Sequence, residues 1–298
     1  MTEAPIFVAP LARSGGTLLA TLLDAHSRCA MSYEIYPDLL VGPEETVLNA
    51  RGALDALEAS RTTQPIEWIR GAGLGKKFET FCFRARRGGL EVGELMADLR
   101  RHAEAGGELE TLNGRLDFID RLLRTKARNA DKPRWGGKMK APLDVLAERH
   151  PDARFLCSLR DGRDVLASQQ KVGSFDADPE YVAQLWRDHV RSFERFAAQN
   201  PGRAHIVRYE ELVTQPSAVI RAVCDFLEEP FDSAMLSFET QPLTLFDNPQ
   251  GHLSAGQLRE GLNQSSLGRW RNELSASDIE AFSRVAGGTL DRFGYPRG

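Results

Sequence analysis

The chain has 298 residues, of which 42% are hydrophobic and 27% are charged, a composition typical of a folded globular protein. Its formal net charge of −4 at pH 7 argues against a general nucleic-acid-binding protein. The length allows one large α/β domain with an added segment, so we expect residues 1–298 to form a single domain.

The N-terminal residues and the cysteines indicate the cellular compartment of the protein. Residues Met1–Pro5 run directly into an apolar segment, without the basic stretch and long apolar core of a signal peptide. No apolar run is long enough to cross a bilayer. The four cysteines are scattered and form no CxxC pair, as expected of thiols in a reducing compartment. We therefore expect a cytoplasmic protein of bacterial type without a transmembrane segment.

The segment Ile6–Asp24 predicts a strand, a turn of small residues and a helix. Ile6–Val8 is long enough for one buried strand, and four leucines follow Thr17 at helical spacing. This order is typical of a phosphate-binding loop, in which backbone N–H groups and a helix N-terminus hold an anion. Gly15 and Gly16 let the backbone approach the anion closely because they carry no Cβ atom.

The loop departs from the nucleotide-hydrolase pattern GxxxxGK[ST] at the position of the lysine. When the two are aligned on Gly15 and Thr17, Pro10 replaces the first glycine and Gly16 replaces the lysine. The cation of the loop is instead Arg13. The pattern predicts a site for a phosphate ester, although an ordinary turn is the alternative for such a loop considered alone.

The middle of the chain has a different character. Residues 41–134 contain few strand-like runs and several amphipathic helical patches punctuated by glycines. We expect a helical insert that covers the site on the substrate side; a plain helical layer on the sheet is the alternative. We interpret the basic run Arg84–Arg87 as a solvated face rather than a ligand clamp. Residues 242–264, with several Pro and Gly, are expected to form a flap-like loop.

A second strand–loop–helix unit follows further along the chain. Ala153–Leu159 predicts an apolar strand, and Arg160 follows at its carboxyl end, where parallel sheets bind ligands. Ser168 lies about one turn into the next helix. An arginine fork and a serine hydroxyl suit a phosphate. The alternative is that the charges of Arg160–Asp164 pair only with one another. Both units together predict an α/β fold, a P-loop-like parallel sheet flanked by helices.

The remaining elements are expected from their hydrophobic patterns. Trp135–Pro142 is interpreted as the approach to a helix, and a loop is expected to open at Glu211. Strands are predicted over Ser27–Ser32 and His205–Glu210, and helices over Leu143–His150, Tyr181–Ala198, Pro216–Leu227 and Ser275–Phe293.

Several of these motifs together resemble those of the sulfotransferases that use 3′-phosphoadenosine 5′-phosphosulfate (PAPS). The motifs are Pro10–Leu18, Asp24–His26, Arg160–Asp164 with Ser168, Arg208–Leu212 and Gly268–Trp270. They occur in the family's order over residues 5–40 and 135–297. The bacterial and tyrosylprotein branches are more similar than the cytosolic phenol branch. The family's usual loop is RSGTT, so Gly16 is a departure from it.

The resemblance implies roles for the donor-binding residues. The 5′-phosphosulfate would be held by the first loop, at Arg13, Ser14, Gly15, Gly16, Thr17 and Leu18. Arg160 and Ser168 would hold the 3′-phosphate. Tyr209 would contact the adenine, and the segment of Arg269 and Trp270 would close over the nucleotide; core packing is the alternative for Tyr209 and Trp270. 3′-Phosphoadenosine 5′-phosphate (PAP) would be the product, and no metal ion is required.

The chemistry of sulfuryl transfer points to the remaining candidates, since it needs in-line positioning, charge stabilisation and a base. The tyrosylprotein branch has a Glu twenty-one residues after the loop Arg, and this offset leads to Glu34. A solvated or helix-capping Glu is the alternative, and His26 is the second candidate for the base. Lys140 fits the family's Lys-x-Pro register and is preferred as the cation for the leaving phosphate. Lys138 fits the Trp-Gly-x-Lys register and is the alternative candidate for this cation.

The acceptor is expected to be a hydroxyl or amine of a small molecule, glycan or peptide. Two other classes of protein are considered. A small-molecule kinase with a degenerate phosphate loop is disfavoured because the loop lysine is missing. A catalytically inactive nucleotide-binding protein is disfavoured because Glu34 and both lysines are present.

Overall fold

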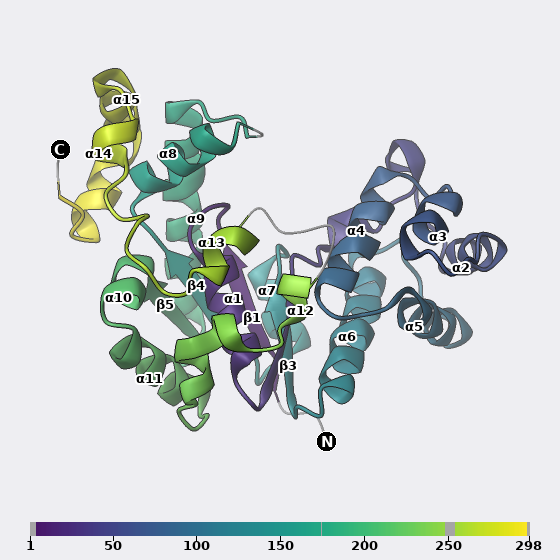
Figure 1. Ribbon diagram of the computed structural model, residues 1–298. Helices are drawn as coiled ribbons and strands as arrows, with labels where there is room; N and C mark the ends of the chain where they lie inside the picture. The colour runs from purple at the N-terminus through teal and green to yellow at the C-terminus, as the bar shows by residue number, and fades with distance from the viewer. Residues whose placement is uncertain (1–3, 174, 248–253, 297–298) are drawn as a thin grey trace.

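A parallel sheet of five strands lies at the centre of this computed structural model, which describes residues 4–173, 175–247 and 254–296. The strands are β1 (Ile6–Pro10), β2 (Cys29–Tyr33), β3 (Arg134–Lys138), β4 (Arg154–Leu159) and β5 (Ala204–Arg208). Their order is β2-β3-β1-β4-β5, and every neighbouring pair is parallel. Helices cover both faces of the sheet (Figure 1), so the predicted α/β class is confirmed.

The helices of the described residues connect these strands and extend beyond them. They are α1 (Gly16–Ala25), α2 (Ala50–Ala59), α3 (Pro65–Gly71), α4 (Lys76–Arg87), α5 (Val92–Glu104), α6 (Leu112–Asn129), α7 (Leu143–Arg149), α8 (Gly162–Val172), α9 (Pro179–Gln199), α10 (Tyr209–Thr214), α11 (Pro216–Leu227), α12 (Thr244–Asp247), α13 (Ala255–Arg259), α14 (Trp270–Glu273) and α15 (Ala276–Arg292). Short 3₁₀ segments are η1 (Pro37–Leu39), η2 (Pro43–Glu45) and η3 (Ser233–Thr240).

The central strand β1 is buried on both faces, which explains its short continuous apolar run. Ile6 and Val8 pack on one face with residues of α1, α10 and α11. Phe7 and Ala9 pack on the other face with residues of α6, α7 and the end of α9. The alternation follows from the two-residue period of a strand. Because β1 is fixed on both faces, the loop that follows it has a well-defined starting point.

Strand β3 differs from the sequence prediction, which interpreted this segment as the approach to a helix. It lies between β2 and β1, with Gly136 opposite Ile6 and Gly137 opposite Phe7. A Cβ atom on Gly136 would lie only 2.0 Å from the carbonyl oxygen of Ile6. The close approach of two backbones therefore requires glycine here. The same glycines have low strand propensity, and so they hid the strand in the sequence.

Two further differences concern the C-terminal half. The predicted strand over His205–Glu210 ends earlier, and Tyr209–Thr214 is helix α10 where a loop was expected. The predicted flap-like loop contains α12 and α13, while residues 248–253 lie outside the described residues.

In the described parts of the chain, no helix combines the length and the apolar character that crossing a membrane requires.

The segment expected to be a helical insert is helical. Helices α2 to α5 form a lobe beside the sheet, and α6 packs along β2 and β3 (Figure 1). Helix α4 has its own contact with the sheet, since it packs against β2 and against η1. The lobe therefore reaches the carboxyl end of β2 through α4.

We predict that Gly136→Ala strongly destabilises the protein, because the new methyl group meets the backbone of β1. Overpacking of this kind costs about 1–3 kcal/mol, and an unyielding backbone places the loss at the upper end. The free energy of unfolding from urea titration measures it.

Gly287→Ala in α15 is the control for this prediction. Among the described residues outside its own helical turn, no atom lies within 4 Å of the position that a Cβ atom would take at Gly287. That change is expected to gain about 0.5–1 kcal/mol, because alanine is favoured over glycine inside a helix. Equal stability of the two variants would contradict the packing described for β3.

Candidate functional site

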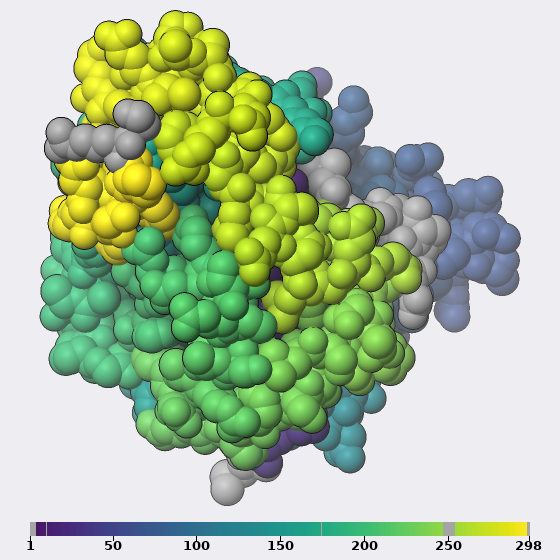
Figure 2. Space-filling model, turned by 60° about the vertical axis from the view of Figure 1, so that its left-hand side comes forward, coloured from purple at the N-terminus to yellow at the C-terminus, as the bar shows by residue number. Residues whose placement is uncertain are grey.

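A cleft of about 1650 Å³ opens at the carboxyl end of the sheet. Its walls come from the β1–α1 loop, α4, the residues after β3, α9 and the segment 254–266. Figure 2 shows the chain after residue 254 running over one face of the molecule, between the C-terminal helices and the helices of residues 205–247. Ligands of open parallel sheets bind outside the carboxyl ends of the strands. The cleft is thus in the expected place.

The β1–α1 loop has the geometry of an anion site. Gly15 is the N-cap of α1 with a φ of 94°, and no described side chain caps the helix. A Cβ atom at Gly15 would lie 2.6 Å from the ring of Tyr209, so only glycine fits. The first-turn N–H groups of a helix have no intrahelical acceptor. Those of Gly16, Thr17 and Leu18, which line the cleft, are therefore suited to bind an anion.

Ser14 has a different position from its neighbours in the loop. Its hydroxyl donates to the carbonyl oxygen of Leu11 at 2.8 Å. Its own carbonyl oxygen accepts from the hydroxyl of Ser158 at 2.6 Å. Both bonds tie the loop to itself and to β4. Ser14 thus supports the shape of the loop through both its hydroxyl and its backbone carbonyl oxygen.

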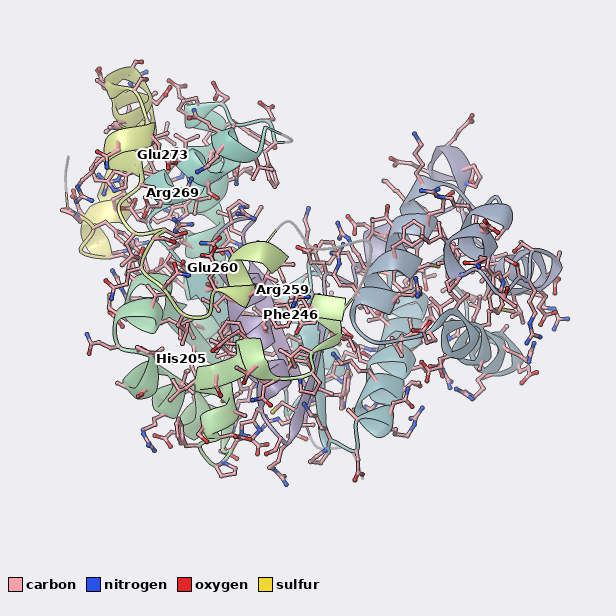
Figure 3. All side chains as sticks on the ribbon, viewed as in Figure 1. His205, Phe246, Arg259, Glu260, Arg269 and Glu273 are labelled. Atoms are coloured by element: carbon pink, nitrogen blue, oxygen red, sulfur yellow. The ribbon has the colours of Figure 1, made fainter. Side chains whose placement is uncertain are left out.

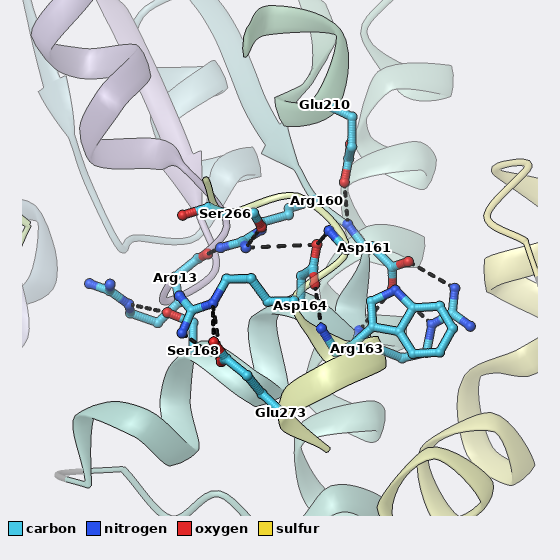
Figure 4. A network of polar contacts seen from close by, with 12 residues as sticks. Arg13, Arg160, Asp161, Arg163, Asp164, Ser168, Glu210, Ser266 and Glu273 are labelled. Carbon is cyan, nitrogen blue, oxygen red and sulfur yellow. Dashed lines mark hydrogen bonds and ion pairs between the residues drawn. The ribbon is translucent and has the colours of Figure 1, made fainter. Parts of the chain in front are cut away.

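Arg160, the residue after β4, lies at the centre of a polar network (Figure 4). Its guanidinium donates to the carbonyl oxygen of Arg13 at 3.3 Å and to that of Ser266. It lies 3.7 Å from a carboxylate oxygen of Asp164 and 4.9 Å from the ring centre of Tyr209. Its Nε is buried and has no hydrogen-bond partner among the described residues. A buried donor without an acceptor is costly, so a ligand oxygen fits this position.

Arg13 is held beside this network by two serines. Its Nε donates to the hydroxyl of Ser168 at 2.9 Å, and another nitrogen donates to Ser254 at 3.0 Å. Burial lowers the pKa of Arg13, and the charges of Arg160 and Arg269 lower it further. Cations that repel one another are stabilised by an anion between them. The predicted residues Arg13, Arg160 and Ser168 are thus brought together.

The alternative that the run Arg160–Asp164 pairs internally holds only in part. Arg163 binds Asp161 through two nitrogens, at 3.0 and 2.8 Å. Asp164 instead accepts from the backbone N–H groups of Gly268 and Trp270, at 2.9 and 3.0 Å. The run therefore also fastens a distant segment to the start of α8.

Arg269 is the N-cap of α14, and Trp270 is the first residue of that helix. The Trp270 ring is buried between the guanidiniums of Arg163 and Arg271, whose carbons lie 3.8 and 4.4 Å from its ring centre. Arg269 pairs with Glu273 at 2.6 Å, and Figure 3 labels these two residues, one at each end of α14. Within the described residues, neither lines the cleft. The core-packing alternative thus describes the position of Trp270, whereas Tyr209 does line the cleft.

Lys138, the last residue of β3, joins two of the predicted site residues. Its ammonium donates to the hydroxyl of Thr17 at 3.0 Å and to a carboxylate oxygen of Glu34 at 2.7 Å. Burial lowers the pKa of Lys138, and the Glu34 carboxylate opposes that shift. Lys140 lines the cleft but is exposed. Of the two lysines, Lys138 is therefore the one in contact with both Thr17 and Glu34. Because strand β3 was not recognised in the sequence, the burial of the Lys138 side chain could not be predicted.

Glu34 follows β2 directly and has an unusual backbone. Its φ of 60° lies in the left-handed region, which costs a non-glycine residue about 1 kcal/mol or more. Its N–H donates to the carbonyl oxygen of Lys138 at 3.1 Å. The carboxylate lines the cleft. Strained residues of this kind are common at functional sites.

His26 lies at the C-terminal end of α1, away from the carboxyl ends of the strands. Its Nε2 is 2.9 Å from the carbonyl oxygen of Pro230, and its Nδ1 accepts from the backbone N–H of Arg28 at 3.0 Å. Both ring nitrogens therefore serve the fold. Of the two candidates for the base, Glu34 lines the cleft and His26 does not.

The basic run of the insert does not form the solvated face that its sequence predicts. Arg84 and Arg87 on α4 line the cleft, and their side chains are only 23% and 13% exposed. They lie 4.0 and 3.7 Å from a carboxylate oxygen of Glu34. The available signal was their spacing of three residues on an amphipathic helix, which places them on one face. Nothing in the sequence placed that face beside Glu34.

His189 of α9 also lines the cleft and was not predicted. Its Nε2 lies 3.5 Å from the sulfur of Cys157 in β4. Burial lowers the pKa of His189 to about 4, although a hydrogen bond to the backbone of Ala9 opposes that shift. The neutral ring therefore fastens α9 to the ends of β1 and β4.

In the described part of the chain, no group of three or more His, Cys, Asp or Glu side chains could hold a metal ion.

Comparisons with known proteins identify the family and the fold. The sequence pattern of the "Sulfotransferase family" matches residues 5–233. The chain is 24% identical to protein-tyrosine sulfotransferase A of Caenorhabditis elegans, over 99% of this chain and 68% of the relative. It is 22% identical to protein-tyrosine sulfotransferase of Drosophila melanogaster, over 94% of this chain and 50% of the relative.

Among solved structures, the fold is similar to that of the sulfotransferase domain of the Synechococcus PCC 7002 olefin synthase. The TM-score is 0.63 at 18% sequence identity, and the match covers 97% of this chain and 95% of that domain. At this identity the likeness concerns the fold.

We predict that His189 makes the stability of the protein depend on pH. Between pH 6.5 and about 4 the unfolded chain binds a proton that the folded ring does not, so stability falls as the pH falls through this window. The shift corresponds to at most about 3 kcal/mol. Urea unfolding of the wild type and of His189→Gln at pH 7, 5.5 and 4 measures it. The difference between the two proteins should change with pH; parallel curves would refute the role of His189.

Proposed function

This chain belongs to the sulfotransferase family, and on that premise we propose that it transfers a sulfuryl group from PAPS to an acceptor hydroxyl or amine. One observation carries the proposal: Lys138 bridges Thr17 of the anion-binding loop and Glu34 of the cleft. A group that binds the loop and a group activated by Glu34 would meet at this lysine. The family match supports sulfuryl transfer rather than the kinase alternative, and an enzyme rather than an inactive nucleotide-binding protein.

The residues of the cleft fit the two phosphate positions of the donor. The N-terminus of α1, with Arg13 and Thr17, suits the 5′-phosphosulfate. Arg160 and Ser168 suit the 3′-phosphate, since the buried Nε of Arg160 lacks a partner among the described residues. Tyr209 is placed to stack on the adenine, because its ring lines the cleft beside Gly15. Arg269 and Trp270 are assigned a supporting role through Asp164, which binds the backbone at Gly268 and Trp270.

The proposed mechanism needs little from the protein besides position and charge. PAPS supplies a sulfuryl group whose bond to the phosphate oxygen breaks as the bond to the acceptor oxygen forms. Glu34 takes the proton of the acceptor hydroxyl. Lys138 donates to the oxygen at which the leaving phosphate gains charge, and Thr17 orients that ammonium. PAP and the sulfated acceptor are the products.

The acceptor side of the cleft belongs to the helical insert 41–134 and to α9, in a single domain that spans residues 1–298. Phe83 and Arg84 of α4, with Tyr36, line the cleft around Glu34. A phenolic hydroxyl is the acceptor to test first, because two of the relatives are protein-tyrosine sulfotransferases. Small-molecule and glycan hydroxyls follow as alternatives. The segment 242–264 is proposed to bound the donor side, since Ser254 and Gln257 line the cleft.

We predict that Arg160→Ala weakens binding of adenosine 3′,5′-bisphosphate far more than binding of adenosine 5′-phosphate. A charge-assisted hydrogen bond contributes roughly 1.5–3 kcal/mol, which corresponds to about 10- to 150-fold in affinity. Calorimetry with both ligands measures the difference. Adenosine 5′-phosphate is the internal control, because any general damage to the site would affect both. Equal losses for the two ligands would remove Arg160 from the 3′-phosphate position.

We predict that Glu34→Gln slows sulfuryl transfer by roughly 10²–10⁴-fold, the usual contribution of a general base. The affinity for the bisphosphate should change little, because Gln keeps the size and the hydrogen-bonding oxygen of Glu. The loss should be smaller for acidic phenols, which need less help to lose a proton. Single-turnover transfer from labelled PAPS measures the rate.

His26→Asn is the matched control for the base. It should lower the melting temperature, since His26 binds Pro230 and Arg28, but leave the rate per folded molecule close to that of the wild type. A fast Glu34→Gln enzyme beside a folded, inactive His26→Asn enzyme would reverse the assignment.

A further inference from the structure

Helix α4 brings two arginines of the insert to the carboxylate of Glu34. Arg84 and Arg87 lie one helical turn apart on α4, at 4.0 and 3.7 Å from the same carboxylate oxygen. The other carboxylate oxygen accepts from Lys138 at 2.7 Å. Each oxygen of Glu34 therefore faces positive charge, one from the sheet and the other from the insert.

Arg84 also holds the backbone of the same segment. It donates to the carbonyl oxygen of Glu34 at 3.1 Å, and its guanidinium lies 4.9 Å from the ring centre of Tyr36. The N–H of Glu34 is bound from the opposite side by Lys138 of β3. The left-handed backbone of Glu34, with a φ of 60°, is thus fixed between β3 and α4. A strained conformation persists only where its surroundings hold it.

We propose that Arg84 and Arg87 are positioning residues for the base: Arg84 fixes the direction of the Glu34 side chain, and Arg87 keeps its carboxylate ionised. This inference rests on the proposed role of Glu34. It assigns to the insert two groups that position and charge the base, whereas the insert otherwise would only form a wall for the acceptor. The two arginines act through different physical effects, so they can be tested apart.

The role of Arg87 is electrostatic. Among the described residues, the charged and titratable groups that face Glu34 include Arg84 and Arg87 from α4, Lys138 from β3, Arg13 from the first loop, and Tyr36. A nearby cation favours the ionised form of a carboxyl group. Removing the charge of Arg87 should therefore move the acidic limb of the rate–pH profile to higher pH, by about one unit.

The role of Arg84 depends on the planar guanidinium. A lysine at this position keeps a positive charge but not the combined contact with the Glu34 carbonyl oxygen and the Tyr36 ring. Arg84→Lys should therefore lower kcat by roughly tenfold or more, as a loss of orientation does, and leave the acidic limb nearly in place.

The experiment compares rate–pH profiles of single-turnover transfer for Arg84→Lys, Arg87→Gln and Arg87→Lys. Arg87→Gln should shift the acidic limb of the profile to higher pH, with a plateau rate near that of the wild type. Arg87→Lys should return the acidic limb to its wild-type position. Arg86→Gln is the matched control: Arg86 is on the same helix with a similarly covered side chain, but it pairs with Glu91 at 3.5 Å. Its profile should match the wild type.

Bisphosphate affinity, measured by calorimetry for every variant, reports whether the donor site is folded. If Arg84→Lys and Arg87→Gln give the profile of Arg86→Gln while Glu34→Gln is slow, the positioning proposal is wrong and the base is retained. If Glu34→Gln is itself as fast as the wild type, the proposed function of Glu34 fails first. If the acidic limb of Arg87→Lys is shifted as far as that of Arg87→Gln, the electrostatic role of Arg87 is also wrong.

Discussion

The site depends on the two hydrogen bonds that the Lys138 ammonium donates. The ammonium is buried at the end of β3, and it donates both to the loop after β1 and to the residue after β2. A buried charge is stable only when its partners are close and well oriented. The three strand ends must therefore keep their register for this lysine to be satisfied. Fold and site are linked through a single side chain.

The opposite side of the cleft is organised around a carboxylate. Asp164 near the start of α8 accepts from the backbone of Gly268 and Trp270, about a hundred residues further along the chain. The same aspartate lies 3.7 Å from Arg160. These two bonds are made by backbone N–H groups, and they hold the C-terminal segment together with the buried ring of Trp270. The cations of Arg13 and Arg160 both line the cleft.

The features that follow from short-range patterns were predictable from the sequence. The strand of Ile6–Val8, the small residues Gly15 and Gly16, and Arg160 at the end of an apolar strand have local signals with a direct physical meaning. Strand β3 was missed because close backbone packing selected glycines, which carry no strand signal. Because the strand was missed, the sequence could not show that Lys138 is buried beside Thr17 and Glu34 while Lys140 is exposed. Arg84 and Arg87 were misjudged because their partner lies about fifty residues away in the sequence.

The contact between α4 and the residue after β2 has a consequence for the evolution of specificity. An insert that only lined the acceptor pocket could be exchanged between relatives as a module, with a new pocket wall and an unchanged reaction rate. Here the insert also carries two of the charges that face Glu34. A chimera with a foreign insert would receive a new pocket and lose the counter-charges of Glu34 in the same step. On the proposed function, substitutions on α9, which lines the same cleft, would change the wall of the acceptor pocket without removing these two charges.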